Sequence, residues 1–250
     1  LGKLHPLYFA SIQFFLHFQL NGWLIFGVTA MIFHFLKRKK GNVPFPKAAF
    51  IILQLSLLLT YTLSITWSTP ESFLFYLNGI GVLLQLIAFL ILGAFIKKYF
   101  EVKLNFKDLS SWLLLAGLIS LALKVIAQTA VAIPYIAEIS YTIRNFVIGF
   151  IHLTLIGAVS FSLLGIFVKS KLLPYNAGAN AAYILFIVAY ASTEFLLFYQ
   201  GLRFWLEQGF IPFYHIIIFS ASLLFPIAIF LILTKFYRHR KLNLNQINSN

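Results

Sequence analysis

The sequence predicts an all-α polytopic membrane protein, a transmembrane helix bundle of seven spans with the N-terminus outside and the C-terminus cytoplasmic. Hydrophobic residues make up 61% of its 250 residues and charged residues only 10%, and the mean hydropathy is +0.91. A bilayer core is crossed by about 20 apolar residues, and seven long apolar segments fill the chain. We therefore expect one transmembrane domain over residues 1–240, followed by a polar cytoplasmic tail at 241–250.

Each predicted helix is an apolar run bounded by polar or turn-forming residues. In chain order the interruptions are the loops 37–47, 68–71, 97–108, 134–140, 169–177 and 201–211, and the tail from Tyr237. The helices between them cover about residues 8–36, 48–67, 72–96, 110–133, 141–168, 178–200 and 212–236.

The orientation follows from the loop charges, because Lys and Arg are enriched in cytoplasmic loops. The loops after the first, third and fifth helices and the tail after the seventh hold most of the basic residues, whereas the other three loops hold almost none. Basic residues at the cytoplasmic ends of the spans thus account for the net charge of +13. In a soluble protein the same charge would suggest that the protein binds nucleic acid. The lipid bilayer is the expected partner, and nucleic acid is not.

The composition excludes several classes of site. The chain has no cysteine, which excludes disulfides, haem attached through a C-x-x-C-H motif, thiolate-bound clusters and cysteine nucleophiles. We find no internal repeat, Rossmann fingerprint or P-loop. Neither a basic region nor a cleavage site follows Leu1, so we predict no signal peptide and expect the chain to begin inside a longer protein.

Ionisable residues lie inside the predicted spans, where they are costly and commonly functional. The loop charges place all of them in the outer half of the bilayer. They are His17, Lys124, Arg144, His152 and Glu194, with His215 at the mouth of the seventh helix. At about 1.5 Å of rise per residue, His17 lies roughly 14 Å below the outer end of the first helix, and His152 is similarly deep.

Two stripes of polar residues follow helical spacing. Gln13, His17 and Asn21 recur every four residues in the first helix, and Lys124 and Gln128 do the same in the fourth. Lipid cannot solvate such stripes, so we expect them to face the interior of the bundle.

The fifth helix carries a third polar line. Asn145 and His152 are seven residues apart and lie nearly on one face, and Gly149 and Gly157 nearby would admit a close helix contact or a cofactor. We expect the polar groups to converge in one outer-half cluster. The candidate cofactor-binding residues are His152, Arg144, Asn145 and Lys124, the candidate metal ligand is His17, and the rest of the cluster comprises Gln13, Asn21, Gln128, Glu194 and His215.

Each of these residues also has a structural interpretation. His17 and His152 either form interhelical hydrogen bonds or bind a metal or haem iron. Lys124 and Arg144 either extend toward the outer headgroups or offset a buried anion such as a haem propionate or a quinone headgroup. Glu194 is either a partner of Lys124 or a proton carrier. If no cofactor is bound, the same groups fit a transporter or a structural membrane subunit.

Three segments carry a resemblance to a known family. They are residues 8–23 (YFASIQFFLHFQLNGW), 124–129 (KVIAQT) and 144–153 (RNFVIGFIHL). These segments resemble an uncharacterised family of bacterial polytopic membrane proteins, and the resemblance covers most of the chain. Members of that family have further N-terminal helices with a His-x-His motif, which this chain lacks.

That family is in turn remotely similar to subunit I of haem-copper oxidases and nitric oxide reductases. Subunit I has a metal-ligating histidine in its sixth helix and haem-ligating histidines in its tenth. If the first helix of this chain corresponds to the sixth, His17 and His152 occupy the matching places. Residues 60–67 lack the histidine pair that completes the copper site, and the fifth helix has one histidine instead of two, so the resemblance does not imply a complete oxygen-reducing centre.

What the resemblance implies is a smaller site. Its cofactor would be haem b at His152, with a second histidine from the missing N-terminal helices, or a non-haem metal at His17. The implied role is electron transfer or small-molecule redox chemistry in the bacterial inner membrane. Other respiratory-chain subunits or the missing N-terminal helices are the implied protein partners.

The loop charges generate a topology prediction. Paired reporters that are active on opposite sides of the membrane should place fusions after Lys40, Lys103 and Asn250 in the cytoplasm and fusions near Pro70, Ile139 and Gln208 outside, because basic loops are retained in the cytoplasm. A single reversed pair in the intact protein would contradict both the orientation and the depth assigned to the histidines.

Overall fold

The computed structural model describes residues 5–41, 43–66, 68–69, 71–99 and 108–248, and this part of the chain is helical without strands. Within it, seven helical runs are long and apolar enough to cross a membrane, which confirms the predicted all-helical class and the number of spans. These runs are Pro6–Arg38, Lys47–Thr66, Ser72–Lys98, Leu109–Ala130, Arg144–Lys169, Ala177–Trp205 and Tyr214–Arg238. The predicted end of the second helix at Trp67 lies outside the described residues.

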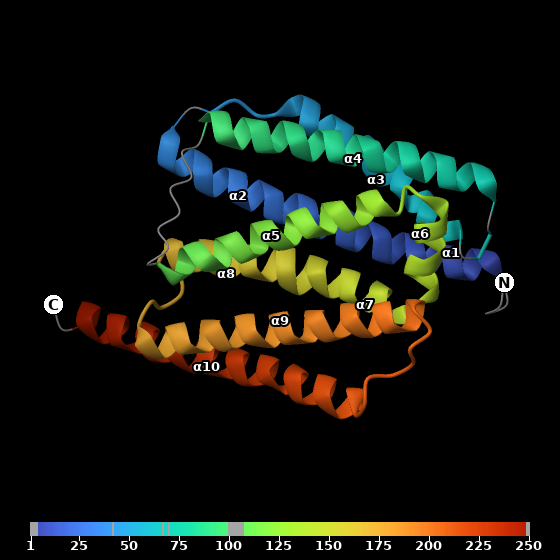
Figure 1. Cartoon of the computed structure of the whole chain (residues 1–250). Coiled ribbons are helices and arrows are strands. Elements are labelled where there is room, and N and C mark those ends of the chain that lie inside the picture. The colour runs from blue at the N-terminus through green and yellow to red at the C-terminus, as the bar shows by residue number, and fades with distance from the viewer. Residues whose placement is uncertain (1–4, 42, 67, 70, 100–107, 249–250) are drawn as a thin grey trace.

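The helices form a bundle in which successive spans run in opposite directions (Figure 1). In chain order they are α1 (Pro6–His17), the π-helix η1 (Phe18–Leu24), α2 (Ile25–Lys40), α3 (Lys47–Thr66), α4 (Ser72–Tyr99), α5 (Leu109–Ala130), α6 (Pro134–Thr142), α7 (Arg144–His152), the π-helix η2 (Leu153–Phe161), α8 (Ser162–Lys169), α9 (Ala177–Trp205) and α10 (Tyr214–Asn248). The end where α7 begins is called the Arg144 end, and the end where α5 begins is called the Asp108 end.

Two segments differ from the predicted helices. Residues 134–140 were expected to be a loop, but Pro134 begins the short helix α6, which lies across the Arg144 end (Figure 1). Proline suits the first turn of a helix because its missing N–H would have no partner there. Helix α10 continues to Asn248, so the expected tail at 241–250 is helical as far as the structure describes it. Residues 237–248 contain neither Gly nor Pro, so the change from apolar to polar ends the span without ending the helix.

The Asp108 end is fixed by two helix caps. The carboxylate of Asp108 accepts hydrogen bonds from the amide and the hydroxyl of Ser110 at the start of α5. Burial raises the pKa of this carboxyl, but those hydrogen bonds and the Lys169 ammonium 3.9 Å away outweigh burial and hold the pKa below its ordinary value. At the start of α9, Asn176 Oδ1 accepts from the amide of Ala179 at 3.0 Å. Both caps satisfy amides that have no partner within their helix.

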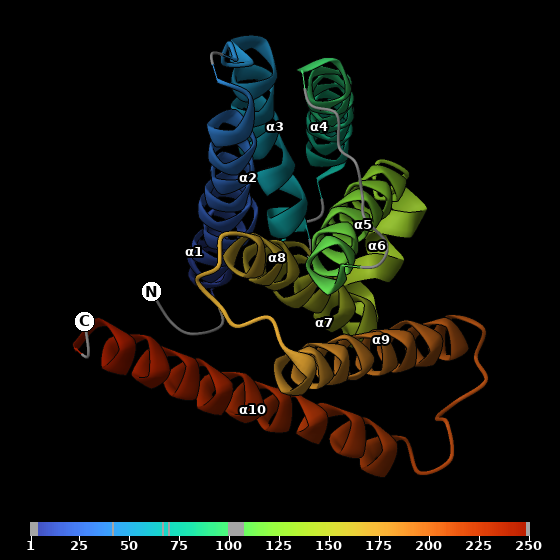
Figure 2. The same cartoon turned by 90° about the vertical axis from the view of Figure 1, so that its left-hand side faces the viewer.

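Helix α5 packs directly on η2 and α8 in the middle of the bundle (Figure 2). Small residues allow this contact. A Cβ atom added to Gly117 of α5 would lie 2.8 Å from the backbone nitrogen of Ser162, and one added to Gly165 of α8 would lie 2.8 Å from that of Leu114. The two backbones therefore touch, as small residues permit in membrane helices.

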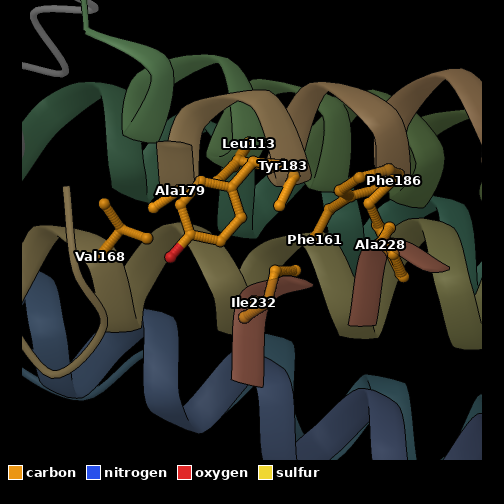
Figure 3. Close-up of a cluster of buried hydrophobic side chains, with 9 residues drawn as sticks. Leu113, Phe161, Val168, Ala179, Tyr183, Phe186, Ala228 and Ile232 are labelled. Carbon is orange, nitrogen blue, oxygen red and sulfur yellow. The ribbon is translucent and has the colours of Figure 1, made fainter. Parts of the chain in front are cut away.

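A cluster of buried side chains holds α9 and α10 to this centre (Figure 3). Tyr183 of α9 is fully buried in the cluster, and its hydroxyl donates to the carbonyl oxygen of Pro174 at 3.1 Å. The cluster comprises Leu113, Phe161, Val168, Ala179, Ala182, Tyr183, Phe186, Ala228 and Ile232. Beyond it α10 packs mainly against α9, and side chains such as Phe230, 66% exposed, cover its outer faces. Such a surface suits contact with lipid.

The contact between α5 and α8 generates a stability prediction. Gly165→Ala should lower the free energy of unfolding by about 1–3 kcal/mol, because the added methyl group overpacks a contact between two backbones. Gly93→Ala in α4 is the matched control. No atom lies within 4 Å of its added Cβ, and alanine favours a helix over glycine by about 1 kcal/mol. Thermal unfolding in detergent measures both, and equal effects would contradict the close contact.

Candidate functional site

Lys124 is the most enclosed charged residue in the described part of the chain, with 0% of its surface exposed. Its ammonium donates a hydrogen bond of 2.6 Å to Gln128 Oε1 and lies 5.7 Å from the ring centre of Phe150 in α7. Lys124 and Gln128 belong to a buried stripe on α5. The stripe follows helical spacing through Leu113, Gly117, Ser120, Lys124 and Gln128. The prediction that Lys124 and Gln128 face the interior is confirmed.

His17 is also buried, with 7% exposed, and both of its ring nitrogens face polar groups. Nε2 lies 2.9 Å from the carbonyl oxygen of Leu57 in α3. A carbonyl can only accept, so Nε2 carries the proton and Nδ1 is left as an acceptor for the amide of Asn21, 3.5 Å away. The π-helix η1 that follows His17 contacts η2, and η2 packs on α5, the helix that carries Lys124. His17 and Asn21 therefore face inward, as predicted, and His17 is accounted for by interhelical hydrogen bonding.

His152 differs from His17 because it is half-buried and its Nδ1 is buried without a hydrogen-bond partner among the described residues. The glycines on its helix are covered by protein. A Cβ atom at Gly149 would lie 3.0 Å from the ring of Phe198, and one at Gly157 would lie 2.6 Å from Ser120 Cβ. The predicted close helix contact at both glycines is confirmed.

Each of the two histidines is the last residue of an α-helix and directly precedes a π-helix. The two π-helices, η1 and η2, contact each other, so the segments that begin at His17 and His152 are neighbours in the bundle. Short π-helical segments are rare and occur frequently at functional sites. The two segments that begin at these histidines share the pattern H-x-x-L-x-G, at residues 17–22 and 152–157. This shared pattern is a signal that the sequence analysis missed, since it found no internal repeat.

A second polar contact joins α5 to α9. The hydroxyl groups of Ser120 and Tyr190 are 3.0 Å apart. Helices α5 and α9 run in the same direction (Figure 1), so the residues four positions further on, Lys124 and Glu194, lie about one turn along on each helix. Both carboxylate oxygens of Glu194 are buried without a hydrogen-bond partner in the described chain, and no ion pair within 4 Å joins Glu194 to Lys124 there.

Ser120 and Tyr190 were not among the predicted site residues. A signal for them exists in the sequence, because each precedes a predicted site residue by four positions and so shares its helix face. What the sequence does not contain is the pairing of the two faces across helices.

The remaining predicted residues lie outside this buried group. Arg144 is exposed at the first position of α7, as expected if its long side chain extends toward headgroups. His215 is exposed, and its ring contacts that of Phe210 in a tilted arrangement, with ring centres 5.5 Å apart. Gln13 is partly exposed. Asn145 donates to the hydroxyl of Tyr214 at 2.9 Å and ties α7 to α10. A single cluster of all the predicted residues is therefore not formed.

The candidate site is a polar layer defined by His17, Asn21, Ser120, Lys124, Gln128, Tyr190 and Glu194, with His152 on the neighbouring helix. Among the described residues, no group of three or more His, Cys, Asp or Glu side chains is placed to hold a metal ion. Hydroxyl, amide, amine and carboxyl groups predominate, and these can exchange protons or bind a small polar solute.

Comparison of the chain with protein-family models, curated proteins and solved structures finds no match. The resemblance to oxidase subunit I therefore stays a prediction. Of its two expected ligands, His152 fits an iron atom better than His17, because only His152 has a buried ring nitrogen without a partner.

Proposed function

We propose that the protein is a multi-pass membrane transporter that carries protons, alone or together with a small solute, through the polar layer around Lys124. The observation that supports this proposal is the complete burial of Lys124 in a membrane-length helix, with a neutral amide as its hydrogen-bond partner. We place the protein in the bacterial inner membrane, with the polar layer in the outer half of the bilayer.

The cost of such a lysine is the physical reason for the proposal. Insertion scales assign about 2.5–3.5 kcal/mol to a lysine at the centre of a membrane helix, so ionisable residues persist there mainly where they are used. The interaction with Phe150 recovers part of this cost. Gln128 is neutral and Glu194 is not within ion-pair distance, so among the described residues no carboxylate holds Lys124 in its charged form as an ion-pair partner.

The groups next to Lys124 supply a route for the proton. Ser120 and Tyr190 each carry a hydroxyl that both donates and accepts, and their hydrogen bond crosses from α5 to α9. Lys124 lies one turn beyond Ser120, and Glu194 one turn beyond Tyr190. Lys124 and Glu194 are then the two groups that take up and release the proton, and the hydroxyl pair lies between their helices.

This proposal predicts loss of proton transport when Lys124 is neutralised. In liposomes loaded with a pH-sensitive dye, Lys124→Gln should slow the dissipation of a pH gradient at least about tenfold, the equivalent of about 1.4 kcal/mol in barrier height. Glu194→Gln should do the same. Lys97→Gln, which removes an exposed charge at the end of α4, should leave the rate unchanged. Unaltered transport in both variants of the polar layer, or no transport by the unmodified protein, would contradict the proposal.

A second candidate function is haem binding by His152, favoured by its buried and unpartnered Nδ1. A bound haem would supply electron transfer, with respiratory-chain subunits or further N-terminal helices of a longer chain as partners. In this case His152 would be the axial ligand, while Lys124 would provide positive charge for an acidic group.

The haem proposal predicts a spectroscopic signature. The full-length protein, expressed with haem available, should show a reducible Soret band that His152→Ala abolishes or shifts, because imidazole ligation sets the spin state and potential. His17→Ala should spare this band, since both nitrogens of His17 face protein groups. An intact protein that contains neither haem nor metal would remove both histidines as candidate ligands.

A further inference from the structure

An apolar groove of about 310 Å³ lies between η2, α8, α9 and α10, and its lining includes no residue of the polar layer. Figure 2 shows α10 lying well apart from α2. The groove is lined mainly by Leu163, Leu164, Phe167, Phe186, Ile229 and Leu233. The one hydroxyl in its lining, that of Ser160, donates to the carbonyl oxygen of Leu155 at 2.9 Å. The lining therefore presents hydrocarbon.

Positive charge gathers where the groove approaches the Asp108 end. In α10, Lys235 is three positions beyond the lining residue Ile232 and so lies on the same side of that helix, and the exposed Lys171 lies two residues beyond the end of α8 at Lys169. The Lys235 ammonium lies over the first turn of α9, 2.8 Å from the place of a Cβ atom on Gly178. The beginning of a helix carries partial positive charge, so this ammonium has a like charge beside it.

Acidic side chains do not offset this charge in the described part of the chain. Asp108, the acidic residue described at this end, accepts hydrogen bonds from Ser110 and lies beside Lys169. The groove thus combines an apolar wall, within membrane-length helices, with uncompensated positive charge at one end. A ligand that matches both parts has a hydrocarbon chain and an anionic head.

We propose that this groove binds an anionic phospholipid, with an acyl chain against α8 and α10 and its phosphate beside Lys235 and Lys171. Basic pockets between membrane helices are a recurring site for anionic headgroups. The acyl chain of a zwitterionic lipid would cover the apolar wall, but its headgroup has no net negative charge to offset the positive charge of Lys235. A free phosphate would meet the charge but leave the wall uncovered.

Lipid binding can be measured by native mass spectrometry of the purified full chain with phosphatidylglycerol and, separately, phosphatidylcholine. We expect phosphatidylglycerol to be retained and phosphatidylcholine to be lost under the same activation. Lys235→Gln should weaken the binding of phosphatidylglycerol about fivefold, the effect expected for one basic residue at a membrane surface. Lys97→Gln is the matched control, because it removes an exposed charge at the same end but on α4.

The apolar wall is tested by filling it. Leu233→Trp places a larger side chain in the groove at a position that is already 48% exposed, and it should displace the lipid. Leu90→Trp on α4, 64% exposed, should not. Thermal unfolding in neutral detergent shows whether each variant is folded. If Leu233→Trp is misfolded, the binding measured for Lys235→Gln tests the proposal instead.

Equal retention of the two lipids would overturn the proposal, as would unchanged binding in Lys235→Gln. Stabilisation by inorganic phosphate alone, equal to that by phosphatidylglycerol, would identify a phosphate site and would also overturn it. Failure of either kind leaves the transport assay on Lys124 unaffected, because the groove and the polar layer share no residue.

Discussion

The need to satisfy backbone hydrogen bonds without water governs the structure of this chain. A membrane offers no partner for a free N–H or C=O group, so each spanning segment must be a helix that bonds to itself. Polar side chains in the spans obey the same constraint. Thr60, Thr154 and Thr193 are buried, and each donates its hydroxyl to the carbonyl oxygen four residues earlier in its own helix. The polar layer differs, because Lys124 donates to the side chain of Gln128 and the buried carboxylate of Glu194 has no hydrogen-bond partner among the described residues.

The spans were predictable because an apolar run of membrane length has few alternatives to a helix. The helix ends that lie outside the apolar runs could not be predicted in the same way. The polar segment after Phe236 continues α10 because it contains neither Gly nor Pro, and Pro134 opens α6 because proline is suited to a first turn. Neither effect is a property of hydropathy, on which the predicted boundaries depended.

The candidate site was predictable only one helix at a time. Spacing of four residues correctly placed Lys124 with Gln128, and His17 with Asn21, on inward faces. It could not show that the carbonyl oxygen of Leu57 accepts a hydrogen bond from His17, or that the hydroxyl groups of Ser120 and Tyr190 are in contact, because these contacts depend on how separate helices pack. Arg144 and Lys124 were both named as candidate cofactor-binding residues, but Arg144 is exposed at a helix start and Lys124 is buried in a helix interior.

The π-helices have a consequence for how the first and fifth spans are built. A π-helical segment is equivalent to one extra residue inserted in an α-helix, and one residue turns a helix by about 100°. The side chains of α1 and α2 therefore belong to two different angular registers, and so do those of α7 and α8. A helical wheel drawn through either whole span mixes the two. Removing one residue from η1 would restore a continuous α-helix, but it would turn His17 about a quarter of a revolution away from Leu57 or move all of α2 instead.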